Sequence, residues 1–176
     1  RAPDFHFLPV GNAGNITAYW KGFREYFAAG IVRGRPRMFG WQAAGAAPIV
    51  DGKPVDDPHT VATAIRIGNP ASWEGAVAAM KDSGGRIDKV TDDEILAAYR
   101  LVAKTEGIFV EPACAAPLAG LVRCVRENAI PAGSVITATM TGHGLKDPDT
   151  ALNQSEFKPT VVPATREAVS RVIGIG

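Results

Sequence analysis

Residues 5–29 contain an apolar run, a loop of small residues and an amphipathic run, in an order typical of layered α/β proteins. The apolar run, residues 5–10, predicts a strand, and residues 15–29 predict a helix. The turn from strand to helix is made by Gly11, Asn12, Ala13, Gly14 and Asn15, the last of which begins the helix. A strand that turns at once into a helix predicts a sheet covered by helices.

The loop itself has the composition of an anion site. The first N–H groups of a helix have no partner within the helix, and the helix dipole is positive there. Gly11 and Gly14 carry no Cβ to hold a ligand away, while Asn12 and Asn15 tolerate left-handed backbone and add amide donors. We therefore expect a phosphate cradle. The alternative is an ordinary strand–helix connection, since the loop is neither GxGxxG nor a P-loop.

Composition excludes several classes of protein. The 176 residues are 46% hydrophobic with a net charge of +1, which fits one globular domain, or one domain and part of another. Without a basic field or a long apolar run, we expect no nucleic-acid partner and no membrane span. Cys114 and Cys124 are ten residues apart, about 15 Å along a helix, which predicts reduced thiols.

Further strands and helices are expected to alternate along the chain. Apolar segments predict strands at residues 37–43, 85–90, 108–110 and 134–140. Helices are predicted after Ser72 as N-cap, after a capping box at residues 91–94, and from near Pro117. Residues 48–60 predict a surface excursion, the tail from Gln154 is polar, and a weak helix is expected over residues 165–173. The pattern predicts a three-layer α/β fold, an open, mostly parallel sheet with helices on both faces.

Two later segments place small and polar residues directly after predicted strands, where a ligand site is expected. Thr141-Gly142-His143-Gly144 follows one apolar strand, and Glu111 follows another. Ligands of open α/β sheets lie outside these strand ends, so both segments are expected to meet the first loop. The Thr141 hydroxyl is suited to a ring nitrogen. Glu111 is either a cavity residue or an exposed turn residue.

The three histidines and the remaining acidic residues do not form a metal-ligand pattern. His143 is interpreted as a loop residue, His6 as a hydrogen-bonded core residue and His59 as solvated. We therefore predict no metal.

Four segments together resemble one family. Residues 9–15, 64–73, 107–113 and 141–147 are similar to bacterial threonine synthase, and the likeness extends over roughly residues 5–150. The resemblance implies the tryptophan-synthase-β fold and the cofactor pyridoxal 5'-phosphate (PLP). It implies that Gly11, Asn12, Ala13, Gly14 and Asn15 wrap the cofactor phosphate, largely through backbone N–H groups. It also implies that Thr141 meets the pyridine nitrogen.

The resemblance further implies a PLP-dependent carbon–oxygen lyase of threonine biosynthesis. The reaction would convert O-phospho-L-homoserine and water to L-threonine and phosphate, in a cytoplasmic homodimer. The family's Schiff-base lysine lies upstream in a Ser-x-Lys context that no lysine here shares: Lys21, Lys53, Lys81, Lys89, Lys104, Lys146 and Lys158. Lys146 is interpreted as a surface or supporting residue.

The chain is thus expected to be a C-terminal portion, residues 1–176. It would form mainly the large domain that binds the PLP phosphate. It would hold no catalytic residue, lack the N-terminal half that carries the lysine, and be inactive alone.

Three alternatives remain open at this point. The first is another PLP enzyme of the same fold, a serine or threonine dehydratase or a β-replacement synthase. Such enzymes more often have a glycine-richer phosphate loop and a Ser or Cys at the nitrogen. The second is a phosphate-binding α/β domain without a Schiff base, disfavoured because no acidic ribose-binding residue is recognisable. The third is a structural or regulatory domain with a degenerate loop.

Overall fold

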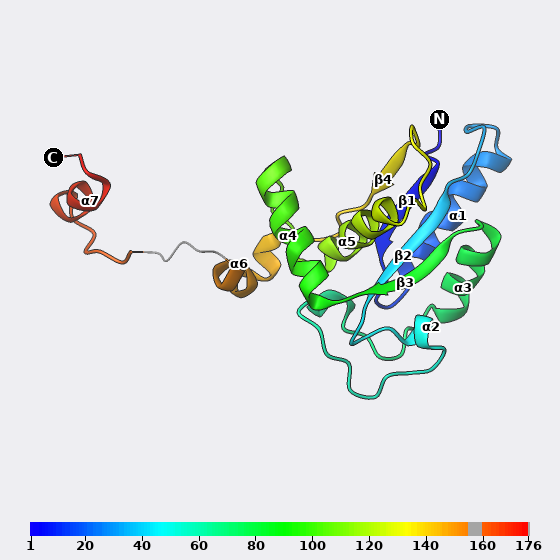
Figure 1. Ribbon diagram of the computed structural model, residues 1–176, viewed down its shortest axis with the longest axis horizontal. Helices are drawn as coiled ribbons and strands as arrows, with labels where there is room; N and C mark the ends of the chain where they lie inside the picture. The colour runs from blue at the N-terminus through cyan, green and yellow to red at the C-terminus, as the bar shows by residue number, and fades with distance from the viewer. Residues whose placement is uncertain (155–159, 176) are drawn as a thin grey trace.

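Four parallel strands form a single sheet in the order β3-β2-β1-β4 (Figure 1). The structure is a computed structural model that describes residues 1–154 and 160–175. In the register, Phe7 lies opposite Phe39 on one side and Ala138 on the other. The strands are β1 (Phe5–Pro9), β2 (Arg37–Ala43), β3 (Arg86–Val90) and β4 (Ile136–Ala138). The predicted parallel α/β sheet is confirmed.

Helices cover both faces of this sheet, so the predicted three layers are also confirmed. Helices α1 and α3 pack together on one face, and α4 and α5 pack together on the other. The helices are α1 (Gly14–Ala28), α2 (Pro48–Asp51), α3 (Trp73–Asp82), α4 (Asp92–Glu106), α5 (Pro112–Arg126), α6 (Pro148–Gln154) and α7 (Arg166–Ile173), with 3₁₀ turns η1 (Thr63–Ile65) and η2 (Gly144–Lys146).

The side chains of the two central strands alternate between the two layers of helices. Phe7 and Trp41 point into the core beneath α4 and α5, where their rings stack with centroids 6.5 Å apart. Leu8, Val10 and Met38 point the other way, against α1 and α3. Both faces of a parallel sheet must be covered because both are apolar, and these strands are buried on both.

The structure confirms some of the predicted helix caps and not others. Thr91 and Glu94 form the capping box at the start of α4. Ser72 occupies the N-cap of α3, but its side chain makes no capping hydrogen bond. The weak helix predicted over residues 165–173 is α7, and the side chain of Thr165 caps it. Within the predicted polar tail, residues 155–159 lie outside the described residues.

The third helix was predicted to begin near Pro117, and this prediction was wrong. Helix α5 begins at Pro112, so Pro117 lies inside it. A proline in the second turn removes the N–H that would reach the carbonyl of Ala113. Most of α5 is buried against the sheet and α4, and this packing keeps the helix continuous.

The strand predicted at residues 108–110 is absent from the sheet that the structure describes. The left-handed C-cap Gly107 ends α4 only five residues before α5 begins, too short a connection to include a sheet strand. Its backbone pairs with the 142–144 turn instead. Val110 bridges His143, and the N–H of Gly144 donates to the carbonyl of Phe109 at 3.2 Å.

His6 is the predicted core histidine. Its Nδ1 lies 2.7 Å from the Thr137 hydroxyl and its Nε2 lies 3.2 Å from the Thr139 hydroxyl, both on or next to β4. Burial lowers the pKa of His6 to about 4. His6 is therefore neutral at pH 7 and ties β1 to β4. His59, in contrast, is largely exposed and pairs with Asp57.

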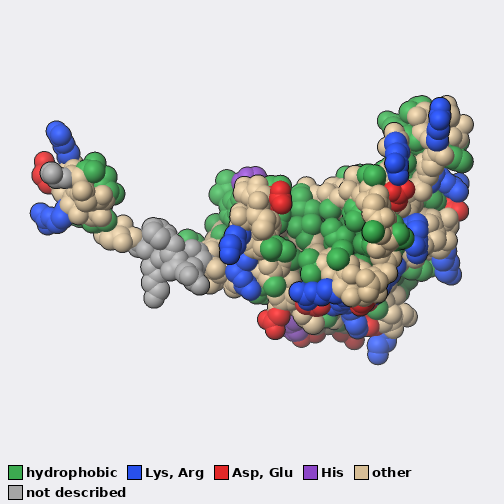
Figure 2. Space-filling model, turned by 45° about the horizontal axis from the view of Figure 1, so that its top comes forward, with side chains coloured by type: hydrophobic (Ala, Val, Ile, Leu, Met, Phe, Trp, Pro, Cys, Tyr) green, Lys and Arg blue, Asp and Glu red, His purple; other side chains and the backbone are tan. Residues whose placement is uncertain are grey.

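Hydrophobic side chains reach the surface over the centre of the face drawn in Figure 2, with charged side chains around them. No helix among the described residues is long and apolar enough to cross a membrane. Cys114 and Cys124 are both buried and free.

Candidate functional site

The three predicted segments meet at one cavity of about 300 Å³ at the carboxyl ends of the strands. The loop after β1, Glu111 before α5 and Thr141 after β4 all line it. The lining residues are Pro9, Gly11, Asn12, Ala13, Gly14, Asn15, Ala64, Ile65, Glu111, Ala113, Thr141 and Lys146. Residues 130 positions apart thus share one cavity, as the strand-end argument predicts.

The loop after β1 leads directly into the first turn of α1. Ala13, the N-cap, has the left-handed values φ 65° and ψ 6°, and helical backbone follows from Gly14. A left-handed residue next to a helical one makes a concave nest of N–H groups that suits an anion. None of the described residues accepts a hydrogen bond from the N–H of Asn12, Ala13, Gly14 or Asn15. The loop therefore offers four free donors at the positive end of a helix.

The two glycines of the loop differ in the space around them. A Cβ on Gly11 would lie 2.9 Å from Ile65 Cα, so Gly11 is needed for the close approach of the chain at η1. A Cβ on Gly14 would meet no atom within 4 Å, and Gly14 is one of the residues that line the cavity. Gly11 therefore serves the fold, while the open space at Gly14 is available to a ligand.

Asn12 has a structural role that the sequence did not predict. Its side-chain Oδ1 accepts a hydrogen bond from the N–H of Ala71 at 2.8 Å, and its carbonyl accepts from the N–H of Ser72 at 3.1 Å. These bonds tie the loop to the segment that leads into α3. The side chain of Asn12 was expected to add donors, yet its carboxamide oxygen holds the loop in place instead.

Thr141 and Glu111 line the same cavity from two adjacent segments. The N–H of Glu111 donates to the carbonyl of Gly142 at 3.2 Å, which joins the two segments. Glu111 is only 6% exposed, so the alternative of an exposed turn residue is wrong. Thr141 is exposed where it lines the cavity.

Sequence reasoning missed several residues of the cavity wall. Ala64 and Ile65 of η1 line it because Gly11 allows their backbone to approach the loop. Lys146, interpreted as a surface or supporting residue, is exposed and lines the cavity from η2. The signal for η1 was the segment of residues 64–73, which carries part of the family resemblance but was not placed at the cavity from the sequence.

His143 does not act as a cavity residue. Its Nδ1 accepts a hydrogen bond from the N–H of Leu145 at 3.1 Å, and its ring lies edge-on to Phe109. It is the loop residue that the sequence predicted. Among the described residues, no group of three or more His, Cys, Asp or Glu is arranged to hold a metal.

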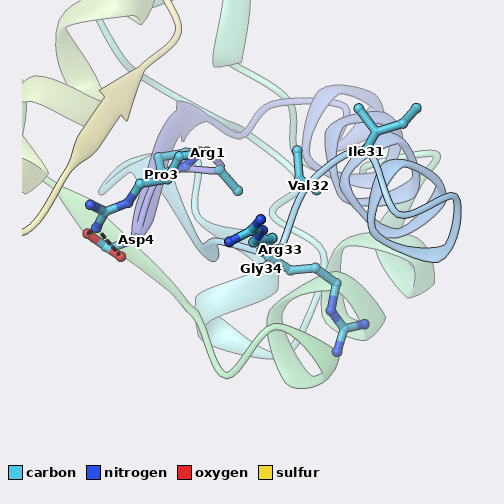
Figure 3. A pocket seen from close by; sticks show the side chains of 9 residues that line it. Arg1, Pro3, Asp4, Ile31, Val32, Arg33 and Gly34 are labelled. Atoms are coloured by element: carbon cyan, nitrogen blue, oxygen red, sulfur yellow. Dashed lines mark hydrogen bonds and ion pairs between the residues drawn. The ribbon is translucent and has the colours of Figure 1, made fainter.

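A second, larger cavity of about 580 Å³ lies at the opposite end of the sheet. Residues 1–4 before β1 and residues 31–35 before β2 line it, including three arginines (Figure 3). Arg1 pairs with Asp4 at 3.1 Å, and Arg35 lies over the rings of Trp20 and Phe27. Two of the three guanidinium groups are therefore already engaged by the protein.

The sequence matches a family described as pyridoxal-phosphate dependent enzyme over residues 1–142. The chain belongs to this family. Its cofactor is PLP, and the predictions of the family and the cofactor are confirmed.

Curated relatives are similar to the chain over almost its whole length. It is 57% identical over 175 residues to threonine synthase of Mycobacterium leprae, covering 99% of the chain and 48% of the relative. It is 52% identical over 168 residues to threonine synthase of Halalkalibacterium halodurans, covering 96% of the chain and 47% of the relative. The chain thus spans about half the length of the relatives it matches.

Solved structures of this fold include two threonine deaminases. The T.th. enzyme superposes with a TM-score of 0.64 at 19% identity, covering 89% of this chain and 52% of that one. The tomato (Solanum lycopersicum) isoform 2 superposes with a TM-score of 0.67 at 18% identity, covering 87% and 42%. At these identities the superpositions establish the fold alone, which is the one expected for this PLP family.

The residues of the cavity fit the family's cofactor. A phosphate needs several N–H donors and space close to the backbone, and the loop supplies both at Gly14. A pyridine ring needs a flat space with a polar group at its nitrogen, and Thr141 is a polar residue among those that line the cavity.

Proposed function

We propose that this chain is the C-terminal half of a threonine synthase, a lyase that releases phosphate from O-phospho-L-homoserine and adds water to give L-threonine. The observation that carries the proposal is the 57% identity to a threonine synthase over 99% of this chain. The rest of the polypeptide would supply the Schiff-base lysine. We use "complete enzyme" for this chain joined to that rest.

In the proposed enzyme the loop residues Gly11, Asn12, Ala13, Gly14 and Asn15 bind the cofactor phosphate through backbone N–H groups. This binding mode is supported by the backbone N–H groups around the left-handed residue Ala13, which have no acceptor among the described residues. When bound, PLP supplies the electron sink for carbanion chemistry on the amino-acid substrate. The protein's part is to orient the ring and set its electrostatics.

The Thr141 hydroxyl is proposed to meet the pyridine nitrogen. A neutral hydroxyl can donate a hydrogen bond to an unprotonated nitrogen, and it holds a ring proton less firmly than a carboxylate would. The electron sink is moderated accordingly. This contact is supported by the position of Thr141, which lines the same cavity as the loop residues 11–15.

The proposal extends to the assembly and location of the enzyme. Resemblance to the threonine synthases supports a cytoplasmic homodimer, with residues 1–176 forming mainly the phosphate-binding large domain. This chain alone would bind no substrate productively, because the lysine lies outside it.

Product analysis on the complete enzyme tests the function. Incubation with O-phospho-L-homoserine is expected to release phosphate and threonine in equal amounts. Ammonia and a 2-oxo acid formed from serine or threonine would instead identify a dehydratase, the alternative within the same fold. Sequencing upstream of Arg1 is expected to find a lysine in a Ser-x-Lys context, and its absence would contradict the division into halves.

A further inference from the structure

Cys114 makes a set of contacts that its neighbours on α5 do not explain. It is fully buried, and its sulfur accepts hydrogen bonds from the N–H of Thr141 and the N–H of Gly142, each at 3.0 Å. Both donors belong to the turn after β4. The third residue of α5 therefore holds two successive amides of the loop that carries Thr141.

The thiol proton has three acceptors within reach, all at the same cavity. They are the Thr141 hydroxyl at 3.4 Å, the Gly142 carbonyl at 3.4 Å and the Glu111 carboxylate at 4.0 Å. If the S–H donates to the Thr141 oxygen, the proton of that hydroxyl is free to point into the cavity. The sulfur thus holds the backbone of the turn, and in that arrangement it would also set the direction of the hydroxyl.

Glu111 gives independent support that this wall faces a polar ligand. Its side chain is more than nine-tenths buried and lines the cavity, and the ion pairs seen among the described residues do not include it. A Cβ on Gly142 would lie 1.9 Å from its Oε1, so the turn and the carboxylate are in close contact. A buried carboxylate without a cation is costly unless something else at the site compensates it.

We propose that Cys114 is a positioning residue that aims the Thr141 hydroxyl at the pyridine nitrogen of PLP. This rests on the proposed contact between Thr141 and that nitrogen. Cys114 itself touches neither cofactor nor substrate. Its part is to keep Thr141 in one backbone position and to occupy the hydroxyl oxygen as acceptor, which leaves the hydroxyl proton for the ring.

Cys124 provides a matched control on the same helix. It is also fully buried, but it lies near the charged side chains of Arg86 and Glu127, away from the cavity. Burial raises the pKa of the Cys124 thiol. Removing its sulfur removes packing from α5 without touching the Thr141 turn.

The test compares Cys114→Ala, Cys114→Ser and Cys124→Ala in the complete enzyme loaded with PLP. The readouts are the absorbance spectrum of the bound cofactor across pH and the PLP dissociation constant. Cys114→Ala is expected to move the spectrum in the same direction as Thr141→Val and to weaken PLP binding about tenfold. Cys114→Ser keeps a donor and an acceptor and is expected to restore both, and Cys124→Ala is expected to change neither.

Failure of the inference is distinct from failure of the proposed function. A normal spectrum in Cys114→Ala beside an altered one in Thr141→Val overturns the role of Cys114 alone. A normal spectrum in Thr141→Val overturns the proposed contact and the inference together. Cys114→Val fills the space without a polar atom and is expected to behave as Cys114→Ala does, so it serves if the alanine variant does not fold.

Discussion

The two ends of the sheet each have a cavity, and the larger and more basic of the two is the poorer candidate for an anion. The cavity at the amino ends of the strands has a volume of about 580 Å³, and three arginines are among the residues that line it. The cavity at the carboxyl ends has a volume of about 300 Å³, and Lys146 is the single cationic residue among the described residues that line it. Volume and charge alone would favour the amino end over the end where we propose the cofactor site.

Hydrogen-bond donors distinguish the ends more clearly. Arg1 is engaged by Asp4, and Arg35 lies over two aromatic rings, so the amino end has already used much of its positive charge. At the carboxyl end, four successive backbone N–H groups have no acceptor among the described residues. Free backbone donors at a helix start, rather than arginines, are therefore the feature on which we base the proposed phosphate site.

The largest effect is expected from Gly14→Val. A side chain at Gly14, which lines the cavity, would meet no protein atom within 4 Å, so we expect it to block the proposed phosphate position and leave the fold intact. Hydrogen bonds to a charged group contribute about 1.5–3 kcal/mol each, so the loss of two predicts at least about 100-fold weaker PLP binding in the complete enzyme.

Gly34→Val is the matched control for this substitution. Gly34 lines the amino-end cavity, and a Cβ there also meets no atom within 4 Å. Its PLP dissociation constant is expected to equal that of the wild type in a titration followed by absorbance. Equal loss of affinity in both variants would erase the distinction between the two ends.

The second effect concerns Gly11, the other glycine of the cradle. In Gly11→Ala the new methyl group would lie 2.9 Å from Ile65 Cα, and backbone cannot move aside cheaply. Overpacking of this kind costs about 1–3 kcal/mol, so the urea midpoint should fall. Gly14→Ala is the control and should unfold close to the wild type. An unchanged midpoint for Gly11→Ala would mean that η1 does not constrain the loop.

Much of this architecture could be predicted because local patterns and tertiary packing agree. The apolar runs that became β1, β2 and β3 are flanked by turns and helices with clear capping signals, such as the box at Thr91. The loop and Thr141 were identifiable as cavity residues because parallel strands bring their carboxyl ends to one edge.

The features that the sequence did not predict depend on contacts between residues far apart in the chain. Residues 108–110 have a strand-like composition, but their backbone partners lie in the 142–144 turn, which no local pattern predicts. Pro117 looked like a helix start, yet the burial of α5 outweighs its missing N–H. The role of Asn12 likewise follows from Ala71, 59 residues away in sequence.

The third effect tests how β1 and β4 hold the carboxyl end together. His6 has a pKa of about 4 when folded and about 6.5 when unfolded. Between these values the unfolded chain takes up a proton that the folded chain does not, so stability is lost as the pH falls from 6.5 to 4. With allowance for partial solvent screening, we expect a loss of about 1–2 kcal/mol.

Urea unfolding of the wild type and His6→Asn at pH 7 and pH 5 measures this effect. The asparagine does not titrate, so its loss of stability over this interval should be smaller than that of the wild type. Equal slopes in the two proteins would show that another group causes the acid sensitivity.

The smallest effect is expected at the amino end, from Arg35→Ala. The guanidinium lies 5.2 Å from the ring centre of Trp20 and 5.1 Å from that of Phe27, so its loss removes two exposed cation–π contacts. Such contacts contribute about 0.5–1 kcal/mol each, which predicts a small drop in the urea midpoint. The PLP dissociation constant should not change, because this arginine serves the packing of α1 and lies at the opposite end of β1 from the cradle. If Arg35→Ala weakened PLP binding as much as it weakened the fold, the amino-end arginines would have a part in the cofactor site, and free backbone donors would no longer be sufficient to locate it.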